Sequence, residues 1–162
     1  MTIEQVKELD FDEVRRLILD KVFVIDTLAL QDNNGALING GFTFINTLLS
    51  FTLGKVHFIS TKKESHHELN RWIDRWHISS HQLFMRPQIW DPKESALKLI
   101  KGVSASDSGG VIVLTPSSKL EKSVVKQCPQ VFKIMKVDNN AVDFNYHKVW
   151  LQFHEPSFWN KK

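Results

Sequence analysis

The sequence predicts an α/β protein in which helices cover both faces of a mainly parallel β-sheet. Five short apolar segments are candidate strands, and four of them contain the β-branched residues that are typical of strands buried on both faces. Segments whose apolar residues recur at helical spacing lie between them. Residues that favour turns separate many of these segments. This alternation of strands and helices is typical of a three-layer Rossmann-like sandwich with right-handed crossovers.

The chain opens with a helical segment that leads into the first strand. Residues 2–20 carry apolar residues at roughly helical spacing, with Thr2 as the expected N-cap and a break near Asp10. The run KVFVI at 21–25 is β-branched and apolar, which predicts a central strand buried on both faces. We therefore expect the first strand to run into Asp26.

Two predicted helices flank the second strand. The segment FTFINTLLSFTLG at 42–54 is apolar on almost every side, which predicts a buried helix that stops at Gly54. The segment KVHFIS at 55–60 is expected to be the second strand. Residues 61–78 then form an amphipathic pattern whose apolar face carries Leu69, Trp72, Ile73 and Trp76.

A short apolar run and a set of capping residues predict the next strand and helix. The run HQLFMR at 81–86 is the candidate for the third strand. The segment DPKESALKLIKG at 91–102 is expected to be a helix with Asp91 as its N-cap, Pro92 at its first position and Gly102 after its end.

The last elements complete the sheet and add an aromatic extension. We expect a strand at 110–114, a helix at 117–128 and a fifth strand at 130–137. The stretch 138–162 is rich in aromatic residues, for which packing onto their own domain is favoured, while a homodimer through this segment stays open. Two alternating sets predict a pair of strands here: Val142, Phe144 and Tyr146, then Val149, Leu151 and Phe153.

Length and composition predict one domain in a reducing compartment. The chain has 162 residues, of which 42% are hydrophobic, and we assign a single domain to 1–162 with an N-terminal helical segment (1–20), a core (21–137) and a C-terminal extension (138–162). A net charge of +3 is too small to predict nucleic-acid binding without a clustered patch. The single cysteine, Cys128, excludes an internal disulfide. No apolar run is long enough for a membrane span and no signal peptide is apparent, so we expect a soluble, cytoplasmic protein without a membrane partner.

Polar residues follow three of the predicted strands. In open parallel sheets, ligands bind beyond the carboxyl ends of the strands. The residues to consider are therefore 26–28, 60–62 and 115–118. The histidines show no metal-ligand spacing, so no metal site is predicted from them.

At these strand ends the chain resembles the haloacid dehalogenase-like superfamily, and within it the phosphatase domains of polynucleotide kinases and their phage relatives. The resemblance covers 21–137. In FVIDTL, Asp26 matches the family's nucleophile, but Leu28 stands where the family has a second aspartate that acts as general acid and base. In VHFISTKK, Ser60 matches the second motif and is followed by Thr61 and Lys62.

The later motifs match less well. The family has a lysine near the start of a helix, for which Lys98 is the first choice and Lys93 and Lys101 are close by. Its fourth motif is a strand that ends in two acids which hold magnesium, whereas VIVLTPSS offers Thr115 and Pro116. The resemblance also implies the sheet order 5-4-1-2-3. The stretch of about sixteen residues between the first strand and its helix is too short for a cap domain, so the fold is expected to be capless.

These departures predict that efficient phosphatase chemistry is lost. Magnesium needs oxygen ligands that usually include one or two carboxylates, and the leaving oxygen needs a proton from a positioned group. Leu28 cannot supply the proton, and the side chain of Pro116 cannot bind the metal. The acids that could replace the missing ones lie in predicted loops: Asp32, Asp91 and Asp107.

The leading hypothesis is a pseudoenzyme, a haloacid dehalogenase-like phosphatase fold that acts as a binding or regulatory module. The likeness to phage proteins implies a viral origin and a place in the host cytoplasm. Its partner would be a protein, or a phosphorylated ligand such as a nucleotide held without turnover by Ser60, Thr61, Lys62 and Lys98. No cofactor is expected, and nucleic acid is only weakly supported as a partner.

Two further hypotheses stay open. One is an active magnesium-dependent phosphatase in which Asp26 is the nucleophile. The other is a structural protein that forms oligomers through the aromatic C-terminal extension. Purely structural roles also stay open for the site residues: Asp26 could brace a loop, Ser60 and Thr61 could cap a helix, and Lys98 could lie on the surface.

Overall fold

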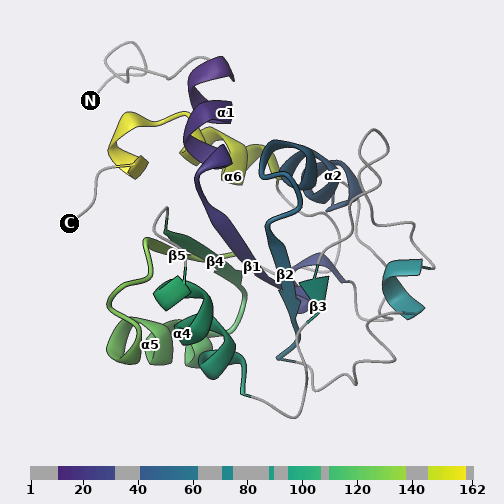
Figure 1. Ribbon diagram of the computed structural model, residues 1–162. Helices are drawn as coiled ribbons and strands as arrows, with labels where there is room; N and C mark the ends of the chain where they lie inside the picture. Colours follow the sequence, from purple (N-terminus) through teal and green to yellow (C-terminus); the bar gives the residue numbers. More distant parts are fainter. Residues whose placement is uncertain are drawn as a thin grey trace.

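A five-stranded, all-parallel sheet forms the centre of the molecule (Figure 1). The computed structural model describes residues 11–31, 41–61, 71–74, 88–89, 95–106, 110–137 and 146–159. The strand order is β3-β2-β1-β4-β5, which is the expected order 5-4-1-2-3 read from the other edge. The strands are β1 (Val22–Asp26), β2 (Val56–Ile59), β3 (Gln88–Ile89), β4 (Val111–Thr115) and β5 (Lys133–Lys136).

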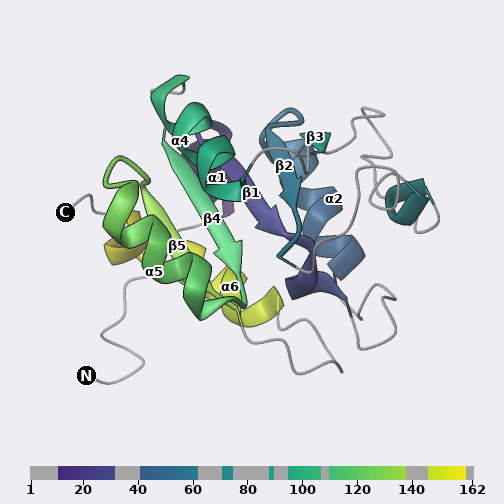
Figure 2. The same ribbon diagram turned by 90° about the horizontal axis from the view of Figure 1, so that it is seen from below.

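Helices cover both faces of this sheet, so the predicted three-layer architecture is confirmed (Figures 1 and 2). One face carries α1 (Phe11–Leu19), α2 (Gly41–Phe51) and α6 (Tyr146–Phe153). The other carries α4 (Ala96–Ser106) and α5 (Ser118–Gln127). Two short 3₁₀ helices complete the described elements: η2 (Thr27–Leu30) and η3 (Pro156–Trp159).

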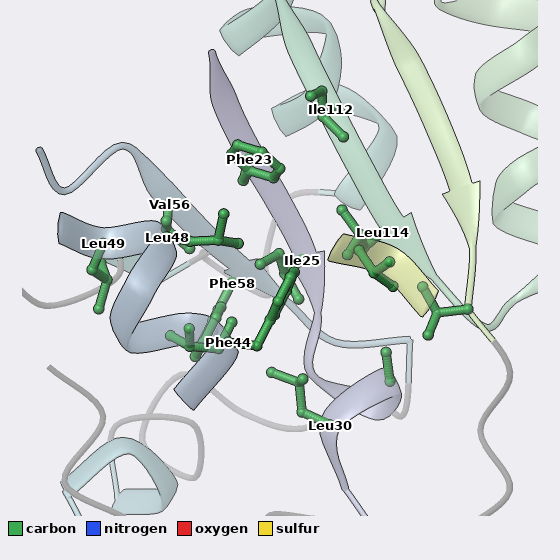
Figure 3. Close-up of a cluster of buried hydrophobic side chains, with 14 of the residues drawn as sticks. Phe23, Ile25, Leu30, Phe44, Leu48, Leu49, Val56, Phe58, Ile112 and Leu114 are labelled. Atoms are coloured by element: carbon green, nitrogen blue, oxygen red, sulfur yellow. The ribbon is translucent and has the colours of Figure 1, made fainter. Parts of the chain in front are cut away.

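Alternation along the strands divides the apolar residues between two cores. In β1, Phe23 and Ile25 point to the core under α1, α2 and α6, while Val22 and Val24 point to the core under α4 and α5. Figure 3 shows the first core, where side chains of β1, β2 and β4 meet those of α2. Full burial of a side chain such as Phe23 contributes about 1.5–3 kcal/mol to the free energy of unfolding. Because the side chains on both faces of β1 are buried, packing holds this strand from both sides.

The C-terminal extension is helical, and the predicted strand pair is wrong for its described part. Val149 and Phe153 are four residues apart and buried, so they lie on one face of α6, while Leu151 between them is 57% exposed. The ring of Phe153 lies 5.9 Å from that of Phe23, and its carbonyl accepts a hydrogen bond from Trp159 Nε1 (2.8 Å). Phe153, Phe158 and Trp159 thus pack onto their own domain, as favoured. The first predicted strand of the pair lies almost wholly outside the described residues.

Other boundaries differ from expectation as well. Gly102 lies inside α4 rather than after it, because the helix continues to Ser106. The hydroxyl of Ser95 accepts a hydrogen bond from the amide of Lys98 (3.1 Å) at the start of α4, whereas the predicted cap, Asp91, lies outside the described residues. The same holds for the candidate strand at 81–86 and for most of the predicted helix at 61–78.

None of the helices in the described part of the chain is long and apolar enough to cross a membrane. Within the predicted helix at 61–78, only Thr61 and residues 71–74 are described, and 71–74 is helical. Trp72 and Ile73 are buried there, in agreement with the predicted apolar face.

Two glycines provide a matched test of the fold. Gly110 precedes β4 with φ of 101°, and a Cβ there would lie 3.1 Å from Phe132 Cβ, so Gly110→Ala should lower the free energy of unfolding by roughly 1–3 kcal/mol. Gly102 lies in an exposed helix interior with nothing within 4 Å of such a Cβ, so Gly102→Ala should raise it by about 0.5–1 kcal/mol. Urea denaturation measures both, and an unchanged Gly110→Ala protein would contradict the described backbone.

A second prediction concerns pH. Burial lowers the pKa of His57, in β2, below its ordinary value, because the charged ring loses solvation. The unfolded chain then binds the proton more readily than the folded one, so stability is full above about pH 6.5 and falls as the pH drops through the folded pKa. In His57→Gln this part of the pH dependence of the unfolding midpoint should vanish. If the unfolding midpoint of His57→Gln changes with pH just as that of the wild type does, His57 has no such effect.

Candidate functional site

The carboxyl ends of β1, β2 and β4 meet at the carboxylate of Asp26. Asp26 is the last residue of β1 and is completely buried. Thr61, just after β2, donates its amide to Oδ1 (3.2 Å) and its hydroxyl to Oδ2 (2.6 Å). Thr115, the last residue of β4, donates its hydroxyl to the same Oδ2 (2.7 Å). The side chain of Asp26 thus links the ends of three neighbouring strands through hydrogen bonds.

Two local interactions extend this network into the following helices. The amide of Leu28 donates to Asp26 Oδ1 (3.1 Å), which makes Asp26 the N-cap of η2. The hydroxyl of Thr115 accepts a hydrogen bond from the amide of Ser117 (3.0 Å). Ser117 in turn caps α5, since its hydroxyl accepts from the amide of Leu120 (3.1 Å). The start of α5 is therefore positioned through Thr115 by the same carboxylate.

The carboxylate of Asp26 has little capacity left for another partner. An ionised carboxylate offers about four acceptor positions, and four protein donors already occupy them. Attack on a phosphorus atom or binding of a metal would require at least one oxygen to leave this network. A carboxylate at position 115 would repel Asp26 at this distance, whereas the hydroxyl of Thr115 donates a hydrogen bond to it.

The structure brings together only some of the predicted site residues. Asp26 and Thr61 are in direct contact, and Ser60 is buried beside them in the chain. Lys98 is exposed in the first turn of α4, and none of the described hydrogen bonds joins it to Asp26. Lys62 lies outside the described residues.

The contacts of the two threonines with Asp26 were not predicted from the sequence. Both had been noted at strand ends, and their hydroxyl groups were the signal that could have indicated donors to a buried carboxylate. Thr27 was not singled out either: it is completely buried, and its Oγ1 has no hydrogen-bond partner among the residues that the structure describes. The acids considered as replacements all lie outside the described residues: Asp32, Asp91 and Asp107.

Among the residues that the structure describes, no group of three or more histidine, cysteine, aspartate or glutamate side chains is arranged to hold a metal ion. A scan of family models, a search of curated proteins and a search of solved structures found no match to this chain. The function must therefore be argued from the geometry of the strand ends.

Removal of one hydroxyl from the network should destabilise the protein. Thr115→Val keeps the side-chain shape but leaves the Ser117 amide and one carboxylate position of Asp26 without a partner, so we expect a loss of about 1–3 kcal/mol. Urea denaturation gives the free energy of unfolding.

The matched control is Thr47→Val in α2. The hydroxyl of Thr47 donates only to the Thr43 carbonyl in its own helix (2.8 Å), at an exposed position, so the loss should stay within about 0.5 kcal/mol. Equal losses in the Thr115 and Thr47 variants would contradict the structural role of the network.

Proposed function

We propose that this chain is a haloacid dehalogenase-like domain that lacks phosphatase chemistry and works as a binding or regulatory module. The observation that carries the proposal is the state of Asp26: its carboxylate is completely buried and accepts four hydrogen bonds from Leu28, Thr61 and Thr115.

A nucleophilic aspartate needs an oxygen that the substrate can approach. Covalent catalysis begins with contact between the nucleophile and the reacting atom. Both oxygens of Asp26 face protein donors, and two hydroxyls point at Oδ2. Leu28 stands where the family has its proton donor, and only its backbone amide takes part in the network. These features support a structural role for Asp26 rather than a catalytic one.

A protein partner suits this geometry better than a phosphorylated ligand. The amide and hydroxyl of Thr61, which were candidate phosphate donors, are both directed to Asp26. A phosphate beside Asp26 would also meet a negative charge that no cation balances among the described contacts. The inward packing of Phe153 and Trp159 favours self-packing of the C-terminal extension over a homodimer through it.

An activity assay combined with a stability measurement tests the proposal. With magnesium and p-nitrophenyl phosphate, wild-type protein should release product at the rate of the blank. Asp26→Asn should behave in the same way but lose about 1–3 kcal/mol of stability, because the new amide group cannot accept the hydrogen bonds that one carboxylate oxygen accepted.

An active phosphatase gives the opposite result. Turnover above the blank that Asp26→Asn abolishes would overturn the proposal and establish Asp26 as the nucleophile. Activity that survives this substitution would point to a contaminating enzyme, which Asp26→Ala would confirm by leaving the rate unchanged.

A further inference from the structure

A groove of about 290 Å³ lies between α1 and the end of α2. The end of α1 leads into β1 and the end of α2 leads into β2, so the groove lies at the amino edge of the sheet, opposite to Asp26. Its lining includes Asp12, Arg15, Arg16, Leu19, Phe51 and Leu53. It therefore combines apolar side chains with charged groups of both signs and is separate from the strand-end network.

The apolar part of the groove includes two exposed leucines. Leu19 is 42% and Leu53 57% exposed, although both are large apolar side chains. Leu53 also has φ of 54°, a left-handed conformation that is unfavourable for leucine and suits glycine or asparagine. Glycine or asparagine would relieve this backbone strain. The chain instead has Leu53, whose apolar side chain lines the groove.

The charged part of the lining holds two arginines, Arg15 and Arg16, and one acid, Asp12. The guanidinium of Arg15 lies 5.7 Å from the centre of the Phe51 ring, a cation–π contact that holds it over the apolar surface. Arg16 is paired with Glu13, whereas within the described chain no carboxylate is paired with Arg15. A guanidinium that is not paired with a carboxylate can bind one from a partner through two parallel hydrogen bonds.

We propose that this groove binds a segment of a partner protein in which a leucine, isoleucine or phenylalanine lies next to an aspartate or glutamate. The apolar side chain would cover Leu19, Phe51 and Leu53, and the acid would pair with Arg15. Small-molecule sites bury most of their ligand, whereas this groove is shallow enough to leave its two leucines 42% and 57% exposed, so an extended peptide fits it better. The assignment rests on the proposed binding role and names its surface and partner.

Selection from a random-peptide phage display library on the immobilised full-length chain tests this assignment. Selected peptides should combine an apolar residue with an acid. Their affinity, measured by fluorescence anisotropy, should fall at least about tenfold for Arg15→Gln, and Arg15→Glu should select basic residues instead.

Leu53→Asn separates binding from folding. Asparagine tolerates the left-handed conformation, so the unfolding midpoint should stay within about 2 °C of the wild type while peptide affinity falls at least about tenfold. The matched control is Leu151→Gln in α6: this leucine is equally exposed at 57% but does not line the groove, so the variant should bind as the wild type does.

The assignment is overturned if no peptide is enriched above an uncoated surface, if the selected peptides lack acids, or if Leu53→Asn and Arg15→Gln bind them as tightly as the wild type. Tighter binding of 4-phenylbutyrate than of any selected peptide would replace the protein partner by a small carboxylate. The phosphatase assay is independent of these outcomes: turnover would remove the proposed function even with a peptide bound, and a failed selection without turnover would remove only the groove.

Discussion

The structure depends on the hydrogen bonds that surround the carboxylate of Asp26. They join residues that are 35 and 89 positions apart in the sequence and lie at the ends of three strands. A buried carboxylate is costly unless polar partners compensate for the lost water. Here two amides and two hydroxyls provide this compensation, and each of them is held by the strand end or turn to which it belongs. The carboxylate and the three strand ends therefore stabilise one another. The loss of any one donor would leave part of the buried carboxylate without a hydrogen bond.

This network also changes what the carboxyl edge of the sheet can do. In open parallel sheets this edge is the usual position of ligands, because the strand ends leave room and side chains converge there. In this chain the converging groups are neutral hydroxyls that point inward to Asp26 rather than outward to a substrate. Thr115 shows the effect most clearly, since its hydroxyl donates to Asp26 and accepts from Ser117. Groups that could polarise a ligand are instead used to hold β1, β4 and α5 together.

Sequence patterns predicted the framework better than the details of the site. The β-branched runs placed β1 and β4 within one residue of their observed positions, because strands buried on both faces need such runs. The extension was misjudged, since buried residues four apart, such as Val149 and Phe153, satisfy both an alternating and a helical pattern. The observed burial follows the helical pattern, because Val149 and Phe153 are buried while Leu151 between them is exposed. Topology places Asp26 near Thr115, but the direction of their hydrogen bond depends on side-chain conformations that no sequence pattern specifies.

The proposed binding role requires a surface that is accessible, and the described surfaces differ in this respect. At the carboxyl edge, Asp26 is covered by its own donors. In the C-terminal extension, Trp159 packs against its own domain, and its indole donates a hydrogen bond to the Phe153 carbonyl. The buried amino group of Lys21 lies 5.9 Å from the centre of the Trp159 ring and 4.8 Å from the centre of the Phe132 ring. The groove between α1 and α2 instead keeps an apolar side chain exposed on a strained backbone, beside an arginine with no carboxylate partner in the described chain. Exposure of this kind lowers the stability of an isolated domain, and a partner that covers the leucines and neutralises the arginine would recover that loss.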